Sequence, residues 1–216
     1  LPKAVLASII MVAVFGLIDF KEAKYLWATD KKDFSMFMVT AIATLTLGVE
    51  EGIAVGVGLS MIMVIYRVSY PHIAEEGKVP GTEEYRNVDR FESVEVYEDV
   101  LIVRLDAQLY FANLGYFQDK LKELELRKTE TLKAVVINAK AINGLDSSAL
   151  HMLHDLIEDY KRREIKLMFS GVKGPIRDAL KQGKLIKEIG EENFFLNVEN
   201  AVKTVHGEEF ERKEGF

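Results

Sequence analysis

The 216-residue chain contains no cysteine, which excludes disulfides, thiolate metal sites and cysteine nucleophiles. It also lacks the G-x-x-x-x-G-K-[ST] loop of many nucleotide-binding proteins and the G-x-S-x-G elbow of many hydrolases. His151 and His154 lie three positions apart, but no further histidine or cysteine is suitably spaced, which favours a solvated helix face over a metal site. We therefore predict no enzyme activity, no catalytic residue, no metal and no cofactor.

The charge of the chain is unevenly distributed. Residues 1–70 contain six basic and six acidic residues, so the net charge of −6 lies entirely in residues 71–216. An acidic module lacks the basic surface that neutralises phosphates, which argues against nucleic acid as a partner.

Three apolar segments dominate the first 70 residues, at about 4–18, 34–49 and 52–67, and the only charge in them is Arg67 at the end of the third. Each is slightly shorter than the roughly 20 residues that cross a bilayer core. A single run of this length would more often be a buried helix of a soluble protein. Three in succession predict membrane helices, with the lipid bilayer as partner.

The segment 19–33 mixes four lysines with Tyr25, Leu26 and Trp27, a composition typical of a helix at the membrane interface. The other turn, Glu50-Glu51, has no basic residue. The positive-inside rule therefore places the lysine-rich segment, Arg67 and the acidic module in the cytoplasm. The two glutamates could form an ion-coupling site, but their place at a turn favours solvated carboxylates.

Gly48, Gly52 and Gly56 repeat at a spacing of four residues, which lines one helix face and allows backbones to approach closely. The alternative is that glycine is simply common in membrane helices. A packing face needs partners, and the chain begins at Leu1 rather than methionine. We therefore expect further membrane helices upstream of this chain.

The acidic module alternates strand and helix patterns. Residues 71–91, rich in proline and glycine, are expected to be a linker, and the last ten residues a disordered tail. Apolar periodicity predicts strands at 93–97, 100–105, 108–111, 133–138 and 165–170, the first two joined by a hairpin turn. It predicts helices at 114–126, 147–163, 175–181 and 197–206. The fold class is α/β with a mixed sheet and amphipathic helices.

Two loops of the module carry candidate sites. Asp146, Ser147 and Ser148 lie between a strand and a helix, where Asp146 or Ser147 would serve as a helix cap. Gly171, Lys173 and Gly174 precede another helix, and their N–H groups and lysine could hold an anion or a nucleotide phosphate. A tight turn that needs glycine is the alternative there.

Several segments resemble a known family. The segments GKVPGTEEYRNV, RLDAQLYFAN, LDSSAL, FSGVKGPIRDAL and GEENFF occur in the order of a STAS domain and the linker before it. The whole chain resembles the C-terminal end of a SulP-type anion permease. The resemblance implies a transmembrane part over 1–70, a linker over 71–91, a cytoplasmic STAS domain over 92–206 and a disordered tail over 207–216.

The resemblance also implies the function of a parent protein. That protein would be a multi-pass secondary active transporter of sulfate or a similar anion such as bicarbonate, in the cell inner (plasma) membrane. Its anion site would lie between half-helices that this chain lacks, so no substrate-binding residue is assigned. The STAS domain would serve assembly, homodimer contacts and regulation, through the helix face from Leu150 to Tyr160 and the Ser148 loop.

Ser148 matches the residue that is phosphorylated in STAS proteins that act as anti-sigma-factor antagonists. A phosphate there would meet the favourable dipole of a helix N-terminus. The alternative function is therefore a membrane-tethered STAS signalling module without transport. A third class, a soluble nucleotide-binding protein, would require the first 70 residues to form a soluble core.

Overall fold

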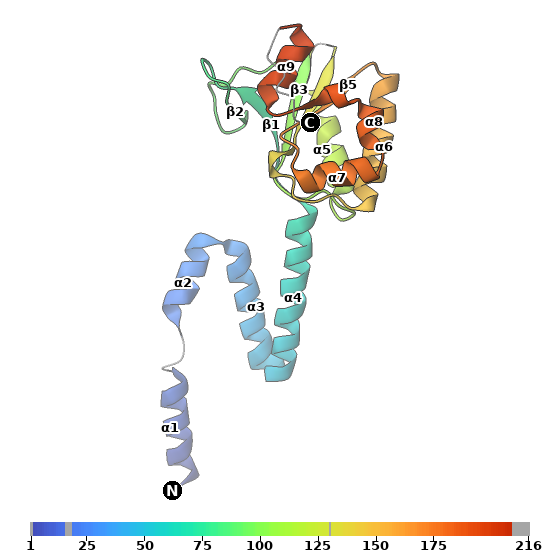
Figure 1. The fold of residues 1–216 in the computed structure, drawn as a ribbon. Helices are drawn as coiled ribbons and strands as arrows, with labels where there is room; N and C mark the ends of the chain where they lie inside the picture. The colour runs from blue at the N-terminus through green and yellow to red at the C-terminus, as the bar shows by residue number, and fades with distance from the viewer. Residues whose placement is uncertain (1, 16–18, 130, 209–216) are drawn as a thin grey trace. The chain divides into compact units, whose positions relative to one another are not determined.

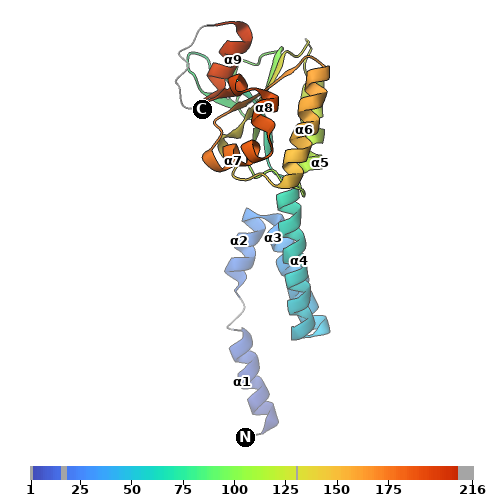
Figure 2. The ribbon, with the colours of Figure 1, turned by 45° about the vertical axis from the view of Figure 1, so that its right-hand side comes forward.

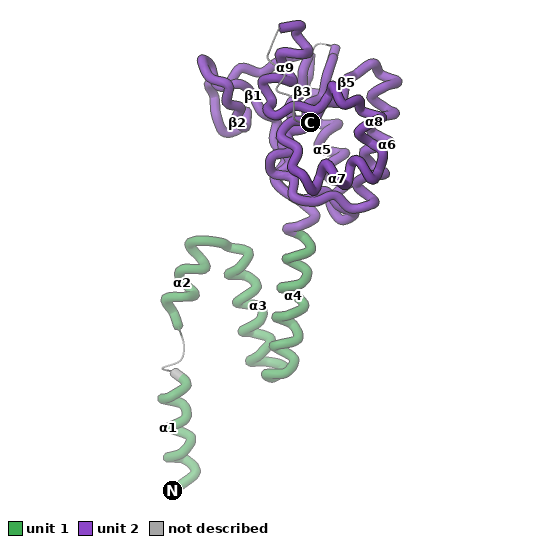
Figure 3. Tube along the Cα trace, viewed as in Figure 1, with its two compact units in different colours: residues 1–66 green, residues 67–216 purple. Residues whose placement is uncertain are grey.

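Figures 1 and 2 show the computed structural model, which describes residues 2–15, 19–129 and 131–208. The chain divides into two compact units, residues 1–66 and 67–216 (Figure 3). The disordered tail was predicted over 207–216, of which residues 209–216 lie outside the described residues.

The first unit is helical. Its helices are α1 (Lys3–Phe15), α2 (Phe20–Thr29), α3 (Lys31–Leu47) and α4 (Val49–Ser69), the last of which continues into the second unit. Asp19 caps α2, because its carboxylate accepts hydrogen bonds from the backbone N–H groups of Lys21 and Glu22. Asp30 ends α2 and caps α3 in the same way, so the predicted interface segment forms a separate short helix.

Glycines lie where α4 comes close to α3. A Cβ added at Gly52 would lie 2.6 Å from the Cα of Thr44, and one added at Gly56 would lie 3.0 Å from the Cγ2 of Thr40. Gly48, between the two helices, has a φ of 120°, which side-chain-bearing residues rarely adopt. The spacing seen in the sequence therefore coincides with a close helix–helix approach.

Among the described residues, α4 alone is long and apolar enough to cross a membrane by length and composition, and the apolar part of α1, Lys3–Val14, is shorter. Large apolar side chains on α1, α3 and α4 are nevertheless exposed, including Val12, Leu45 and Ile62. Such surfaces need lipid or further helices to cover them. The prediction of three membrane spans stays a prediction.

The second unit contains a six-stranded mixed sheet in the order β2-β1-β3-β4-β5-β6, which confirms the predicted fold class. Its strands are β1 (Ile73–Lys78), β2 (Tyr85–Asn87), β3 (Val100–Leu105), β4 (Ala134–Asn138), β5 (Lys166–Ser170) and β6 (Phe194–Phe195). Strand β1 pairs antiparallel with β2 and β3, and the strands from β3 to β6 are parallel.

Helices cover both faces of the sheet (Figures 1 and 2). One core packs the sheet against α5 (Leu114–Leu126), α6 (Ser147–Arg162), α7 (Gly174–Gln182) and α8 (Leu185–Ile189). The other packs it against α9 (Val198–His206). The four predicted helices are confirmed within a residue or two, whereas α8 and β6 were not predicted.

Three sequence predictions need correction. Residues 71–91 are not a plain linker, because they contain β1 and β2 of the sheet. Residues 93–97 form only one bridge, between Glu95 and Lys78, and residues 108–111 form only one, between Leu109 and Leu145. Strand β1 has the sequence IAEEGK, in which charged residues hide the strand pattern; its two glutamates are buried because each has a cationic partner.

The helix face from Leu150 to Tyr160 is also not a contact surface. Leu153, Ile157 and Tyr160 are buried in the core beneath α6, and Leu150 and Leu156 pack against it. The helical periodicity identified these residues correctly as inward, and most of this face is filled by the domain itself.

Replacement of Gly52 by alanine should destabilise the helical unit by about 1–3 kcal/mol, because the new Cβ would collide with the backbone of Thr44. Gly58→Ala is the matched control, since a Cβ at Gly58 meets nothing within 4 Å. It should be neutral or slightly stabilising, because alanine favours helix. Thermal unfolding of the chain in detergent, followed by helical circular dichroism, measures both; equal midpoints would contradict the close approach.

Candidate functional site

Three loops meet at the carboxyl ends of the parallel strands, the edge where ligands bind in many α/β folds. The loop after β3 contacts the loop after β4, because the Leu109 N–H donates to the Gly144 carbonyl at 3.0 Å. The loop after β4 contacts the loop after β5, because Lys173 Nζ donates to Asn143 Oδ1 at 2.8 Å. The two loops singled out in the sequence therefore lie at the same edge of the sheet.

Asp146 holds the loop after β4 in place. Its Oδ1 accepts a hydrogen bond from the Ala149 N–H at 2.7 Å, which caps α6, and its Oδ2 accepts one from the Phe111 N–H at 2.9 Å. Ser147 is exposed and Ser148 is half-buried in the first turn of α6. No hydrogen bond of either hydroxyl is formed within the described residues, so the structural role belongs to Asp146.

The loop after β5 needs a glycine at position 171. Gly171 has a φ of 64°, and a Cβ there would lie 2.5 Å from the Cγ of Lys140. Its N–H donates to the Phe195 carbonyl at 2.9 Å, which joins the loop to β6. Gly174 begins α7 and has open space around it. The geometry at Gly171 favours a turn that needs glycine, and anion binding by this loop stays a prediction.

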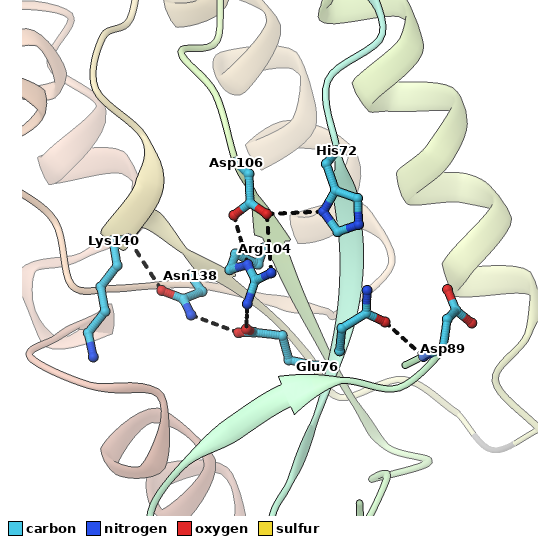
Figure 4. A network of polar contacts seen from close by, with 8 residues as sticks. His72, Glu76, Asp89, Arg104, Asp106, Asn138 and Lys140 are labelled. Carbon is cyan, nitrogen blue, oxygen red and sulfur yellow. Dashed lines mark hydrogen bonds and ion pairs between the residues drawn. The ribbon is translucent and has the colours of Figure 1, made fainter. Parts of the chain in front are cut away.

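A polar network that the sequence analysis missed crosses the sheet near this edge (Figure 4). Glu76 is 3% exposed and accepts hydrogen bonds from Arg104 at 2.8 Å and from Asn138 at 2.7 Å. Arg104 also donates to both oxygens of Asp106, and Asp106 lies 3.0 Å from His72 Nδ1. Burial works against the charged guanidinium, but the two carboxylates outweigh it and raise the pKa of Arg104. The network fixes β1 to β3 and β4.

The end of α4 is held by the loop after β3, within the second unit. Asn113 is fully buried, and its Nδ2 donates to the Gln108 carbonyl at 2.9 Å and to the Val68 carbonyl at 3.5 Å. Its Oδ1 accepts from the Tyr110 N–H at 3.1 Å. The rings of Tyr70 and Tyr116 meet edge to face at 5.2 Å. We call these contacts of Asn113 and of the two tyrosines the exit clasp.

The two neighbouring histidines do not act together. His154 Nδ1 lies 2.7 Å from Glu188 Oε2 on α8, and this hydrogen bond raises the pKa of His154. His151 is exposed. In the described part of the chain, no group of three or more histidine, aspartate or glutamate side chains could hold a metal ion.

Asp146→Ala should destabilise the second unit by about 1–2 kcal/mol, because it removes the cap of α6 and the bond to the loop after β3. Ser147→Ala, the matched control, removes an exposed hydroxyl and should change stability by less than about 0.5 kcal/mol. Urea unfolding measures both. A larger loss of unfolding free energy in Ser147→Ala than in Asp146→Ala would show that Asp146 is not the capping residue.

Comparisons with known proteins place these features in a family. The STAS domain family matches residues 93–201, and the sulfate permease family matches residues 1–40. The chain is 36% identical over 212 residues to sulfate transporter 4.1, chloroplastic, of Arabidopsis thaliana, covering 94% of this chain and 31% of that protein. It is 30% identical over 211 residues to high affinity sulfate transporter 2 of Stylosanthes hamata, covering 94% and 32%.

A solved structure has the same fold. The murine Slc26a9 anion transporter in its inward-facing state superposes with a TM-score of 0.81 at 22% sequence identity, covering 96% of this chain and 34% of that one. The chain spans about a third of the length of the relatives it matches. It belongs to the SulP family of sulfate permease-type proteins and carries that family's STAS domain.

Proposed function

We propose that this chain is the C-terminal part of a secondary active transporter of sulfate or a similar small inorganic anion, and not an enzyme. The observation that carries the proposal is the continuity of the match. Relatives named as sulfate transporters align over 94% of the chain, through both the apolar helices and the STAS domain. Residues 1–70 would supply the last membrane helices, and the half-helices that hold the anion would come from upstream helices.

The STAS domain of the proposed transporter spans residues 92–206 and is extended by β1 and β2. We place it in the cytoplasm, because the lysine-rich segment 19–33 and Arg67 favour that side of the membrane. We assign the protein to the cell inner (plasma) membrane as a homodimer. The glycine face of α4, at Gly48, Gly52 and Gly56, would pack against membrane helices.

The exit clasp supports a regulatory role for the STAS domain. Asn113 is buried and bonded to the end of α4, so a displacement of the loop after β3 must break buried hydrogen bonds or move the helix end with it. Regulation through this contact requires no substrate residue in the STAS domain.

A second candidate function is a membrane-tethered signalling module without transport. The half-buried Ser148 at the N-terminus of α6 favours it, because phosphate there would gain from the helix dipole. Mass spectrometry of the protein from cells would reveal that phosphate. The same helix end, with Asp146, would then bind a partner differently in the two states.

Radiolabelled sulfate uptake tests the proposed function. Cells that express the full-length protein should accumulate sulfate, and collapse of the proton and sodium gradients should abolish accumulation. Asn113→Ala should lower uptake about fivefold at unchanged membrane abundance, because the exit clasp is lost. Asn143→Ala, which removes an exposed amide bonded to Lys173, is the control and should transport normally.

If a correctly inserted full-length protein took up neither sulfate nor bicarbonate, the transport proposal would be rejected. The signalling module would then be the remaining candidate function. Normal uptake by the Asn113 variant would retain transport and reject regulation through the clasp.

A further inference from the structure

A cavity of about 410 Å³ lies among α7, α8 and β6, within the range of small-molecule sites. Four cationic side chains line it, and its apolar part comes from Ile186 and Phe194. Glu191 is the one carboxylate in the described lining. The cations are Arg177, Lys181, Lys184 and Lys187. The cavity is separate from the polar network and from the exit clasp.

The charge of this region opposes that of the module around it. Residues 173–187 contain five basic residues and one acidic residue, Asp178, although residues 71–216 together have a net charge of −6. Glu188, Glu191 and Glu192 follow directly, so the excess of basic residues is confined to 173–187.

The lysines of the cavity lack the partners that other cations of the module have. Lys78, Arg104 and Lys128 each form an ion pair with a buried glutamate. Lys181, Lys184 and Lys187 form no ion pair within the described residues. Three lysines with one carboxylate, Glu191, in the same lining leave an excess of positive charge that a bound anion would offset.

The backbone places Lys184 at this cavity at a cost. Lys184 has a φ of 61° and a ψ of 7°, a left-handed conformation that usually belongs to glycine or asparagine. A glycine is available one position earlier, yet Gly183 has an ordinary φ of −73°. Buried Leu185, the next residue, anchors α8 in the core. A strained residue that could have been glycine indicates that its side chain has a use.

We propose that this cavity binds an organic anion that bears phosphate groups with two or more charges. Several lysines suit a multiply charged phosphate, which they bind as point charges. The apolar part of the lining, with Ile186 and Phe194, suits an organic group attached to the phosphate. The cavity is larger than an inorganic sulfate requires, so the site is distinct from transport of that anion. Soluble phosphate esters and lipid headgroups share this chemistry.

The experiment uses the 216-residue chain in nanodiscs of zwitterionic lipid. Equilibrium dialysis measures binding of pyrophosphate and ADP, with inorganic sulfate as the reference anion. Lys184→Gly removes the charge and the left-handed strain together, so it should raise the midpoint of thermal unfolding while it weakens binding about tenfold. Lys187→Ala should weaken binding similarly. Lys122→Ala is the control, because Lys122 is an exposed lysine of α5 that does not line the cavity.

A second set of nanodiscs contains phosphatidic acid, and competition with ADP or enrichment of this lipid around the chain is measured. Binding of ADP or pyrophosphate that is lost in the two cavity variants supports a soluble ligand. Enrichment of phosphatidic acid alone, lost in the same variants, supports a lipid headgroup. No binding of any probe, binding of sulfate as tight as that of ADP, or equal loss in Lys122→Ala would overturn the proposal.

Discussion

Buried carboxylates on and around strand β1 are the constraint on which the second unit depends. Glu75 bonds to Lys128 at 2.6 Å with side chains 11% and 4% exposed, which fixes β1 to the end of α5. Glu76 bonds to Arg104 of β3 on the opposite face of the sheet. A buried carboxylate without a cation is costly, so each of these glutamates needs its cation to remain buried in the sheet.

Glu199 of α9 completes the arrangement from the other side. It accepts hydrogen bonds from Lys78 of β1 and Tyr85 of β2, both at 2.8 Å. Burial alone would raise the pKa of Glu199, but these two donors outweigh it and lower that pKa. The first two strands are thus attached through these charged contacts as well as through Ile73 and Tyr85, which belong to the two apolar cores. Because β1 follows α4 in the chain, this attachment and the exit clasp both act on the first residues of the second unit.

Sequence patterns predicted the helices of the second unit well because their apolar spacing is strong. The bounds of α5 were predicted without error, and Asn197 caps α9 as expected. The same reasoning missed β1, because its burial depends on cations that are distant in the sequence. It also misread residues 108–111, where the side chain of Asn113 takes the place of a strand partner for Gln108 and Tyr110.

In the candidate sites, too, local features could be predicted from the sequence, whereas contacts between distant residues could not. Capping by Asp146 could be predicted from its position before a helix, but its second bond, to the Phe111 N–H, depends on the fold. The exit clasp needs Asn113 beside Val68, 45 positions apart, and no local pattern indicates it. The basic cavity is visible in the sequence only as a cluster of lysines over 173–187. That these residues line one cavity depends on how α7 and α8 pack.

A double-mutant cycle on Glu75 and Lys128 tests most directly whether buried charge attaches β1 to the domain. Glu75→Leu should lower the free energy of unfolding by about 3–5 kcal/mol, because it leaves the Lys128 ammonium buried without its carboxylate. Lys128→Met should cost a similar amount, because it leaves the Glu75 carboxylate buried without its cation. The double variant Glu75→Leu, Lys128→Met should lose much less, since no charge remains buried. A cost below about 1 kcal/mol for Glu75→Leu, with no coupling between the two positions, would contradict this account.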